Sequence, residues 1–135
     1  ESVEFIAAFM TSSVGNLLIE VISRNNLGLG TLKFEKIDAL KYPVLNISLI
    51  EKDVKSKIVE QWKSISQRET KSIFTELGFD SSKPIREQEP NPLPDRKALD
   101  DIIFDAIGLT EEERKEVYWS VAELVKTRLE KAKSV

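Results

Sequence analysis

Three prolines at alternate positions constrain this chain of 135 residues more than any other feature. Pro90, Pro92 and Pro94 lie in the polar stretch 86–95. Because proline fixes φ and lacks a backbone N–H, this stretch cannot form a helix interior and favours an extended connector. We therefore predict that it separates a helical segment at residues 51–85 from a second helical part at residues 96–135.

Apolar residues recur at helical spacing before this connector. The repeat consists of Val54, Ile58, Trp62 and Ile65. Such spacing predicts an amphipathic helix that begins near Glu51. The polar run 66–72 predicts a break, after which Ile73, Phe74 and Leu77 continue the pattern and Gly78 caps it.

Two further helices are predicted after the connector. The first has an apolar face and ends at Gly108; the face is formed by Leu99, Ile102, Ile103, Ala106 and Ile107. Thr110 and Glu113 have the spacing of a capping box that opens the second helix. Its apolar side consists of Val117, Val121, Leu124, Val125, Leu129 and Ala132. We predict that the two helices pack as an antiparallel helical hairpin.

The short turn at residues 108–110 also has the form of a helix-turn-helix element. In that motif the first turn of the second helix enters the major groove of DNA. Here this turn consists of Glu111, Glu112 and Glu113, which phosphates would repel. The hairpin is therefore expected to be a packing unit.

The first fifty residues have a different pattern. A helix is predicted from Val3 to Ser23, apolar over most of its circumference, which favours a buried helix that lacks part of its packing over an exposed amphipathic one. Polar residues interrupt it too often for a membrane span, and it does not resemble a signal peptide. Short strands are predicted at 31–35 and 43–47. The expected fold class is mainly α (α+β), with a small β element near residues 31–47.

The amino-acid composition excludes several classes of catalytic and metal-binding site. The chain has no histidine and no cysteine, which rules out a conventional serine triad, cysteine nucleophiles and thiolate zinc sites. Asp100, Asp101 and Asp105 are expected to face solvent rather than to bind a metal ion. No catalytic and no metal-binding residue is predicted. The net charge of −3 has the wrong sign for a free-standing nucleic-acid-binding protein.

One loop has the residues to approach a phosphate. Gly28 and Gly30 fail the dinucleotide-binding and Walker templates, so a simple turn remains the plain interpretation. However, glycines allow close backbone approach, and the flanking cations attract DNA. The candidate DNA-binding residues are Arg24, Asn25, Asn26, Gly28, Gly30, Lys33, Lys36 and Lys41.

Six blocks extend in order over nearly the whole chain: FMTSS (9–13), RNNLGLGTLK (24–33), DALKYPV (38–44), SIFTELG (72–78), LDDIIFDAIGLTEEER (99–114) and RLEK (128–131). In this order they resemble the end of the target-recognition region and the C-terminal tail of N6-adenine DNA methyltransferases from restriction–modification systems. No block carries catalytic chemistry. Residues 1–50 would then be the end of the recognition region.

The resemblance implies that the methyl donor, S-adenosylmethionine, and the Asn-Pro-Pro-Tyr/Phe motif belong to an upstream domain. The nearest string here, NPLP at residues 91–94, lacks the aromatic residue that would stack on a flipped adenine. The chain begins at Glu1 and is expected to be a piece of a longer protein. The fragment alone is not expected to be an enzyme, whereas its parent is expected to be an adenine-specific DNA methyltransferase.

The sequence thus supports two hypotheses. In the first, this cytoplasmic, non-catalytic fragment helps to place double-stranded DNA, binds it weakly alone and packs on its methylase domain. In the alternative, it is a helical interaction module that docks onto a methylase or nuclease partner, or onto itself through an exposed apolar helix, without touching DNA. Neither hypothesis involves a membrane.

Overall fold

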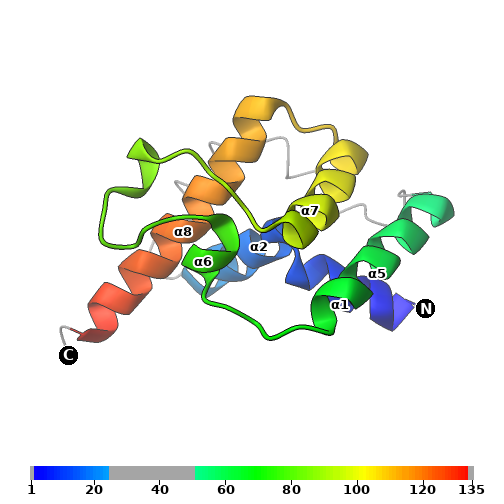
Figure 1. Cartoon of the computed structure of the whole chain (residues 1–135), viewed down its shortest axis with the longest axis horizontal. Helices are drawn as coiled ribbons and strands as arrows, with labels where there is room; N and C mark the ends of the chain where they lie inside the picture. The colour runs from blue at the N-terminus through cyan, green and yellow to red at the C-terminus, as the bar shows by residue number, and fades with distance from the viewer. Residues whose placement is uncertain (1, 25–50, 134–135) are drawn as a thin grey trace.

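The computed structural model describes residues 2–24 and 51–133, which form six α-helices and one 3-10 turn (Figure 1). The elements are α1 (Ser2–Thr11), α2 (Ser13–Arg24), α5 (Lys52–Ser66), α6 (Ile73–Leu77), η4 (Ile85–Glu87), α7 (Pro94–Ile107) and α8 (Glu111–Lys133). The mainly helical class is confirmed. The described residues contain no strand, and the small β element predicted near 31–47 gains no support because it falls outside them.

The predicted break and cap in the 51–85 segment are confirmed. Helix α5 ends at Ser66, and the short α6 follows after the polar run. The Ser72 hydroxyl accepts a hydrogen bond from the backbone N–H of Thr75, at 3.2 Å. Gly78 ends α6 in the left-handed conformation with φ of 77°, which glycine adopts without a Cβ penalty.

The proline connector is free of helix only over residues 88–93, because its first two residues belong to η4. Pro94 was predicted to block a helix, but it is the first residue of α7. At that position the missing N–H costs nothing, because the first N–H groups of a helix have no intrahelical partner. The preceding strand-like segment is fixed to α6, since Asn91 N donates to Leu77 O at 3.0 Å and Leu93 N donates to Glu76 O at 2.9 Å.

The turn between α7 and α8 is as predicted, and the two helices contact each other across it through Phe104 with Tyr118 and Asp105 with Arg114. Thr110 N donates to the Glu113 carboxylate at 2.9 Å, and Glu113 N donates to the Thr110 hydroxyl at 3.2 Å, which completes the capping box. Helix α7 packs mainly on α5, whereas α8 packs mainly on α2. The capping residues next to the turn determine its conformation. The main packing partners of the two helices, α5 for α7 and α2 for α8, depend on residues that are remote in the sequence.

The single helix predicted from Val3 to Ser23 is also wrong, because the chain bends by 81° between α1 and α2. Ser12 lies at the bend and is fully buried. No single helix in the described ranges is long and apolar enough to cross a membrane. The bent pair Val3–Thr11 and Ser13–Val21 passes that test only by length and composition.

One apolar core joins all the described helices. Helices α1, α5 and α7 pack together at one end of the molecule, and α2, α6 and α8 pack together at the other. The core consists largely of Phe5, Phe9, Val14, Leu17, Ile58, Leu77, Leu99, Ile103, Phe104, Val117 and Val121. The bend at Ser12 lies where the two groups meet, so α1 belongs to one group and α2 to the other.

Candidate functional site

Of the predicted DNA-binding residues, only Arg24 belongs to the described part of the chain. It is the last residue of α2. Asn25, Asn26, Gly28, Gly30, Lys33, Lys36 and Lys41 lie outside the described residues. The structure therefore describes the helices that lead to this candidate interface, and above all how α2 is held.

Two charged residues of α7 contact the bend between α1 and α2. The Arg96 guanidinium donates to the backbone carbonyl of Thr11, the last residue of α1, at 3.0 Å. The Asp100 carboxylate accepts from the backbone N–H and the hydroxyl of Ser13, the first residue of α2, at 2.8 and 2.6 Å. A single turn of α7 thus contacts the end of one helix and the start of the next.

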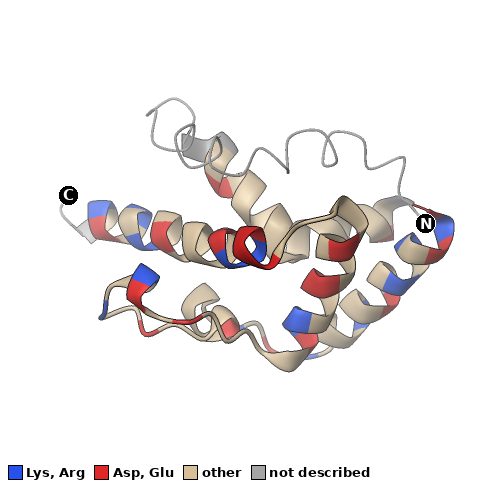
Figure 2. Cartoon of the chain, turned by 90° about the horizontal axis from the view of Figure 1, so that it is seen from above, with Lys and Arg blue, Asp and Glu red and all other residues tan. Residues whose placement is uncertain are grey.

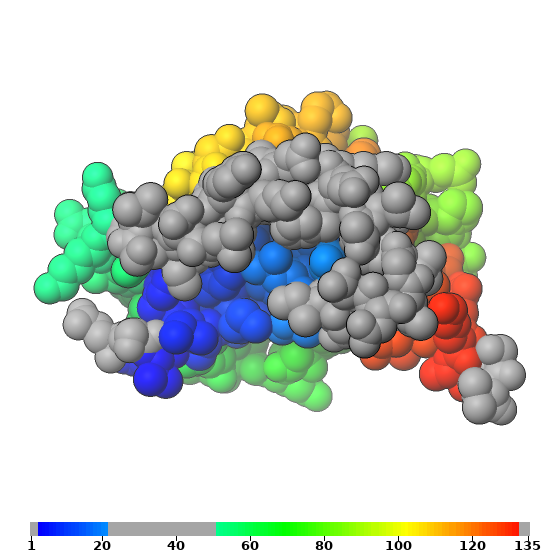
Figure 3. Space-filling view, turned by 180° about the vertical axis from the view of Figure 1, so that it is seen from behind, coloured from blue at the N-terminus to red at the C-terminus, as the bar shows by residue number. Residues whose placement is uncertain are grey.

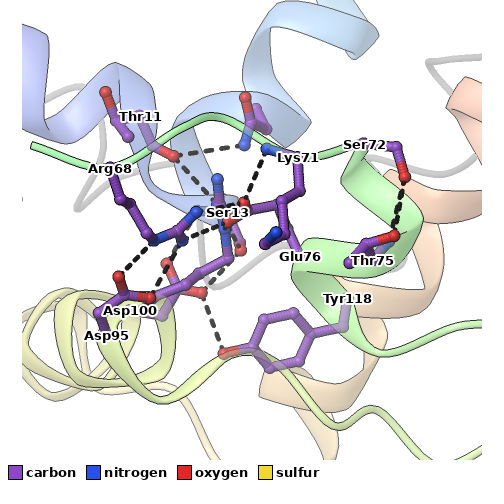
Figure 4. Close-up of polar contacts among 12 residues, drawn as sticks. Thr11, Ser13, Arg68, Lys71, Ser72, Thr75, Glu76, Asp95, Asp100 and Tyr118 are labelled. Carbon is purple, nitrogen blue, oxygen red and sulfur yellow. Dashed lines mark hydrogen bonds and ion pairs between the residues drawn. The ribbon is translucent and has the colours of Figure 1, made fainter. Parts of the chain in front are cut away.

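Asp100 is the clearest error of the sequence interpretation, which placed it in solvent. Its side chain is completely buried, and the Tyr118 hydroxyl of α8 is a third donor to it, at 3.0 Å (Figure 4). Burial raises the pKa of the Asp100 carboxyl, although Arg96 and the Ser13 and Tyr118 donors oppose this effect. Burial, followed by the adjacent Asp100 carboxylate, also raises the pKa of Tyr118. The other two aspartates of this set pair at the surface, Asp101 with Lys97 and Asp105 with Arg114.

A second buried carboxylate, Glu76 of α6, holds the same region together. It accepts hydrogen bonds from Arg68 at 2.8 Å and from Arg96 at 2.9 Å. Arg68 in turn donates to Asp95, at 2.5 and 3.0 Å. The hydrogen bond from Arg68 lowers the pKa of Glu76 to about 2 and also lowers the pKa of Asp95. All of these charges are paired, as buried charges must be to avoid a large desolvation cost (Figure 4).

Hydrogen bonds near both ends of α2 hold this helix against α8. Ser13 and Tyr118 share the Asp100 carboxylate at the first end. One turn before Arg24, the Glu20 carboxylate accepts from Arg128 at 3.0 Å. Because both contacts advance along both helices, α2 and α8 run parallel, and their C-terminal ends lie at the same end of the molecule (Figure 1).

The NPLP string has a packing role. Its backbone pairs with the end of α6, and a Cβ at Gly78 would lie 2.1 Å from the Asn91 carbonyl oxygen. No aromatic residue follows the asparagine and prolines. These residues do not fit the adenine-binding motif of the methyltransferases, and we assign no chemistry to them.

The rest of the described part of the chain offers little chemistry. No three carboxylates within it lie close enough to hold a metal ion. The buried side chains around Asp100 form hydrogen bonds with one another. Both signs of charge occur along α5 and α8, and basic and acidic side chains are intermixed over the described helices (Figure 2). The arrangement can position a segment, but it lacks an activated nucleophile.

The sequence contained a signal for this buried network. The predicted face of α7 included Ile102 and Ala106, whereas the buried face is rotated toward Arg96, Asp100 and Phe104. Arg96 and Asp100 are opposite charges one turn apart, in line with Ile103 and Phe104. Charged residues in line with an apolar stripe can be buried when they find partners, but those partners are remote in the sequence.

No family model, curated protein or solved structure matches this chain. Its function is therefore inferred from the residues, their geometry and the resemblance of the six sequence blocks.

Proposed function

We propose that this chain is the non-catalytic C-terminal part of an N6-adenine DNA methyltransferase, and that it supports a DNA-contacting segment that begins at Arg24. The observation that carries the proposal is the attachment of α2 to α8 near both ends, through Asp100 at Ser13 and through Arg128 at Glu20. A helix held in this way gives the segment after Arg24 a fixed starting point.

The distribution of charge limits how such a fragment binds DNA. The chain has a net charge of −3, and the basic residues of its first fifty positions are Arg24, Lys33, Lys36 and Lys41. DNA affinity depends strongly on neutralised phosphates. Contact is therefore local to residues 24–41, and the isolated chain binds in the non-specific range of roughly 10⁻⁴ to 10⁻⁶ M. S-adenosylmethionine and catalysis belong to the parent protein's upstream domain.

A charge-reversal experiment tests this function. Short duplex DNA is titrated at low salt with the wild-type chain, with the double variant Arg24→Glu/Lys33→Glu, and with Lys52→Glu/Lys57→Glu. The last pair makes the same change of charge on exposed positions of α5, away from the end of α2 (Figure 1). The proposal expects the first variant to lose binding and the control to keep most of it. Equal loss in both variants, or none in either, contradicts it.

A second candidate function is a helical interaction module. The observation that favours it is a row of exposed apolar side chains on α1, consisting of Val3, Ile6 and Met10, with exposed fractions of 76%, 53% and 40%. Their spacing places them on one side of the helix, and α1 contributes to the face shown in Figure 3. Analytical ultracentrifugation decides this candidate: it requires self-association of the wild type that Ile6→Lys abolishes, together with no DNA binding.

A further inference from the structure

We propose that Asp100 and Arg96 are positioning residues that set the bend between α1 and α2. Through this bend they fix the direction in which the chain leaves α2 at Arg24. The importance of that direction for DNA rests on the proposed function, but the origin of the bend does not.

The charges of the two residues match the helix ends that they contact. The C-terminal end of a helix carries a partial negative charge and unpaired carbonyls, and the N-terminal end carries a partial positive charge and unpaired N–H groups. The Arg96 cation contacts the last carbonyl of α1, and the Asp100 anion contacts the first N–H of α2. One turn of α7 thus supplies hydrogen-bond partners for the Thr11 carbonyl and the Ser13 N–H, which lie at the helix ends created by the bend.

These contacts are long-range in the sequence. Asp100 lies 87 residues after Ser13. No residue near the bend supplies an equivalent carboxylate, because the neighbouring side chains are Thr11, Ser12 and Asn16. The Ser12 hydroxyl accepts from Gly15 N at 3.1 Å and donates to Phe9 O at 2.5 Å, so it satisfies only part of the junction.

Close packing at the bend depends on Gly15. A Cβ on this residue would lie 2.2 Å from the Phe9 carbonyl oxygen and 2.6 Å from Met10 Cα. In a continuous helix the same Cβ would project freely, and alanine would be favoured over glycine by roughly 1 kcal/mol. Gly15 is therefore compatible with both shapes, whereas alanine at this position is compatible only with the straight one.

The competing shape is the continuous helix that the apolar pattern of residues 3–23 predicts. In a continuous helix, the Thr11 carbonyl and the Ser13 N–H, which now bond to Arg96 and Asp100, would bond to backbone groups of the same helix instead. It would also separate α2 from α8 or α1 from α5. Removal of the Asp100 carboxylate should consequently shift the population from the bent shape toward the straight one.

Spin labels on α1 and α2 measure this shift directly. The chain has no cysteine, so Val3→Cys and Ile19→Cys provide two unique labelling sites, exposed by 76% and 40%. In a continuous helix their Cα atoms would lie about 24 Å apart, from a rise of 1.5 Å per residue. The 81° bend gives a clearly shorter distance.

Pulsed electron paramagnetic resonance should give one short distance for the doubly labelled wild type. Asp100→Ala, and Gly15→Ala independently, should add a population near the straight-helix distance. The matched control is Ile103→Ala, which removes a fully buried side chain one turn further along α7 and should keep the short distance. Asp100→Asn, which retains one acceptor oxygen but lacks the negative charge, should add a smaller long-distance population than Asp100→Ala.

Two outcomes would overturn the inference. One is an unchanged short distance in the Asp100 variants, and the other is an equal change in Ile103→Ala. If circular dichroism shows that Asp100→Ala does not fold, the labelled Asp100→Asn variant decides alone: an added long-distance population supports the inference, and the wild-type distance overturns it. DNA is absent from this measurement, so its failure is separate from failure of the DNA titration.

Discussion

At the scale of single residues, Glu76 stabilises the fold through two arginines. Its side chain is 2% exposed and lies between Arg68 and Arg96. Glu76→Gln would leave Arg96 buried without its carboxylate partner, which typically costs about 3 to 5 kcal/mol. We expect urea unfolding at pH 7 to show a loss of this order. A loss below about 1 kcal/mol would mean that Arg96 finds another partner.

The same substitution should change the pH dependence of stability. The pKa of Glu76 is about 2 in the folded chain and 4.5 ordinarily. Because the folded value is lower, its stabilisation is present above pH 4.5 and is lost as the pH falls toward 2. Asp100, whose pKa is raised, acts in the opposite direction. The difference in unfolding free energy between wild type and Glu76→Gln should therefore shrink from pH 7 to pH 3. A constant difference contradicts this assignment.

Two glycines form a matched pair for a second prediction. Gly78 and Gly108 both have positive φ, 77° and 73°. A Cβ at Gly78 would clash with the Asn91 backbone, whereas a Cβ at Gly108 would meet nothing within 4 Å. Gly108→Ala should cost about 1 to 2 kcal/mol for the left-handed conformation. Gly78→Ala should cost about 1 to 3 kcal/mol more. Equal urea midpoints for Gly78→Ala and Gly108→Ala would show that the Asn91 backbone shifts to accommodate the added methyl group.

At the scale of helices, the start of α8 depends on a local device. Thr110 and Glu113 exchange hydrogen bonds in a capping box. Thr110→Ala should lower the free energy of unfolding by about 1 kcal/mol, and Thr110→Ser should restore most of it, because a hydroxyl at this position satisfies a free N–H group. Thermal unfolding followed by circular dichroism checks both variants. An alanine variant with the wild-type midpoint would show that tertiary packing alone fixes this helix start.

Elements with local signals were predictable from the sequence. The break after α5, the glycine caps at Gly78 and Gly108 and the capping box at Thr110 depend on residues within a few positions of one another. The bend at Ser12 and the burial of Asp100 depend on contacts between residues 87 positions apart, which periodicity does not contain. The main packing partner of α8, which is α2, was not predicted for the same reason, because tertiary packing determines it.

The candidate site was predictable only in part. The sequence indicated which residues have the charge and backbone freedom to approach DNA, and Arg24 is the only one of them that the structure describes, at the end of α2. It did not indicate how α2 is held, because the partners of Arg96 and Asp100 are remote in the sequence and Asp100 was expected in solvent.

At the scale of the whole molecule, the described helices form a scaffold around one core, and α7 links its two halves at the bend. Under the proposed function, the acidic net charge of −3 would restrict DNA contact to a small region. If Arg24, Lys33, Lys36 and Lys41 each neutralise one phosphate, the slope of log K against log salt should be about −4, from roughly 0.9 per phosphate.

The salt dependence of DNA binding by the wild-type chain therefore tests the central claim most directly. Fluorescence anisotropy with a labelled duplex at several salt concentrations gives the slope. Weak binding with a slope between about −2 and −4 is the expected result, since at most four cations take part. Absence of binding at low salt, or a slope steeper than about −6, would contradict a local DNA contact at residues 24–41.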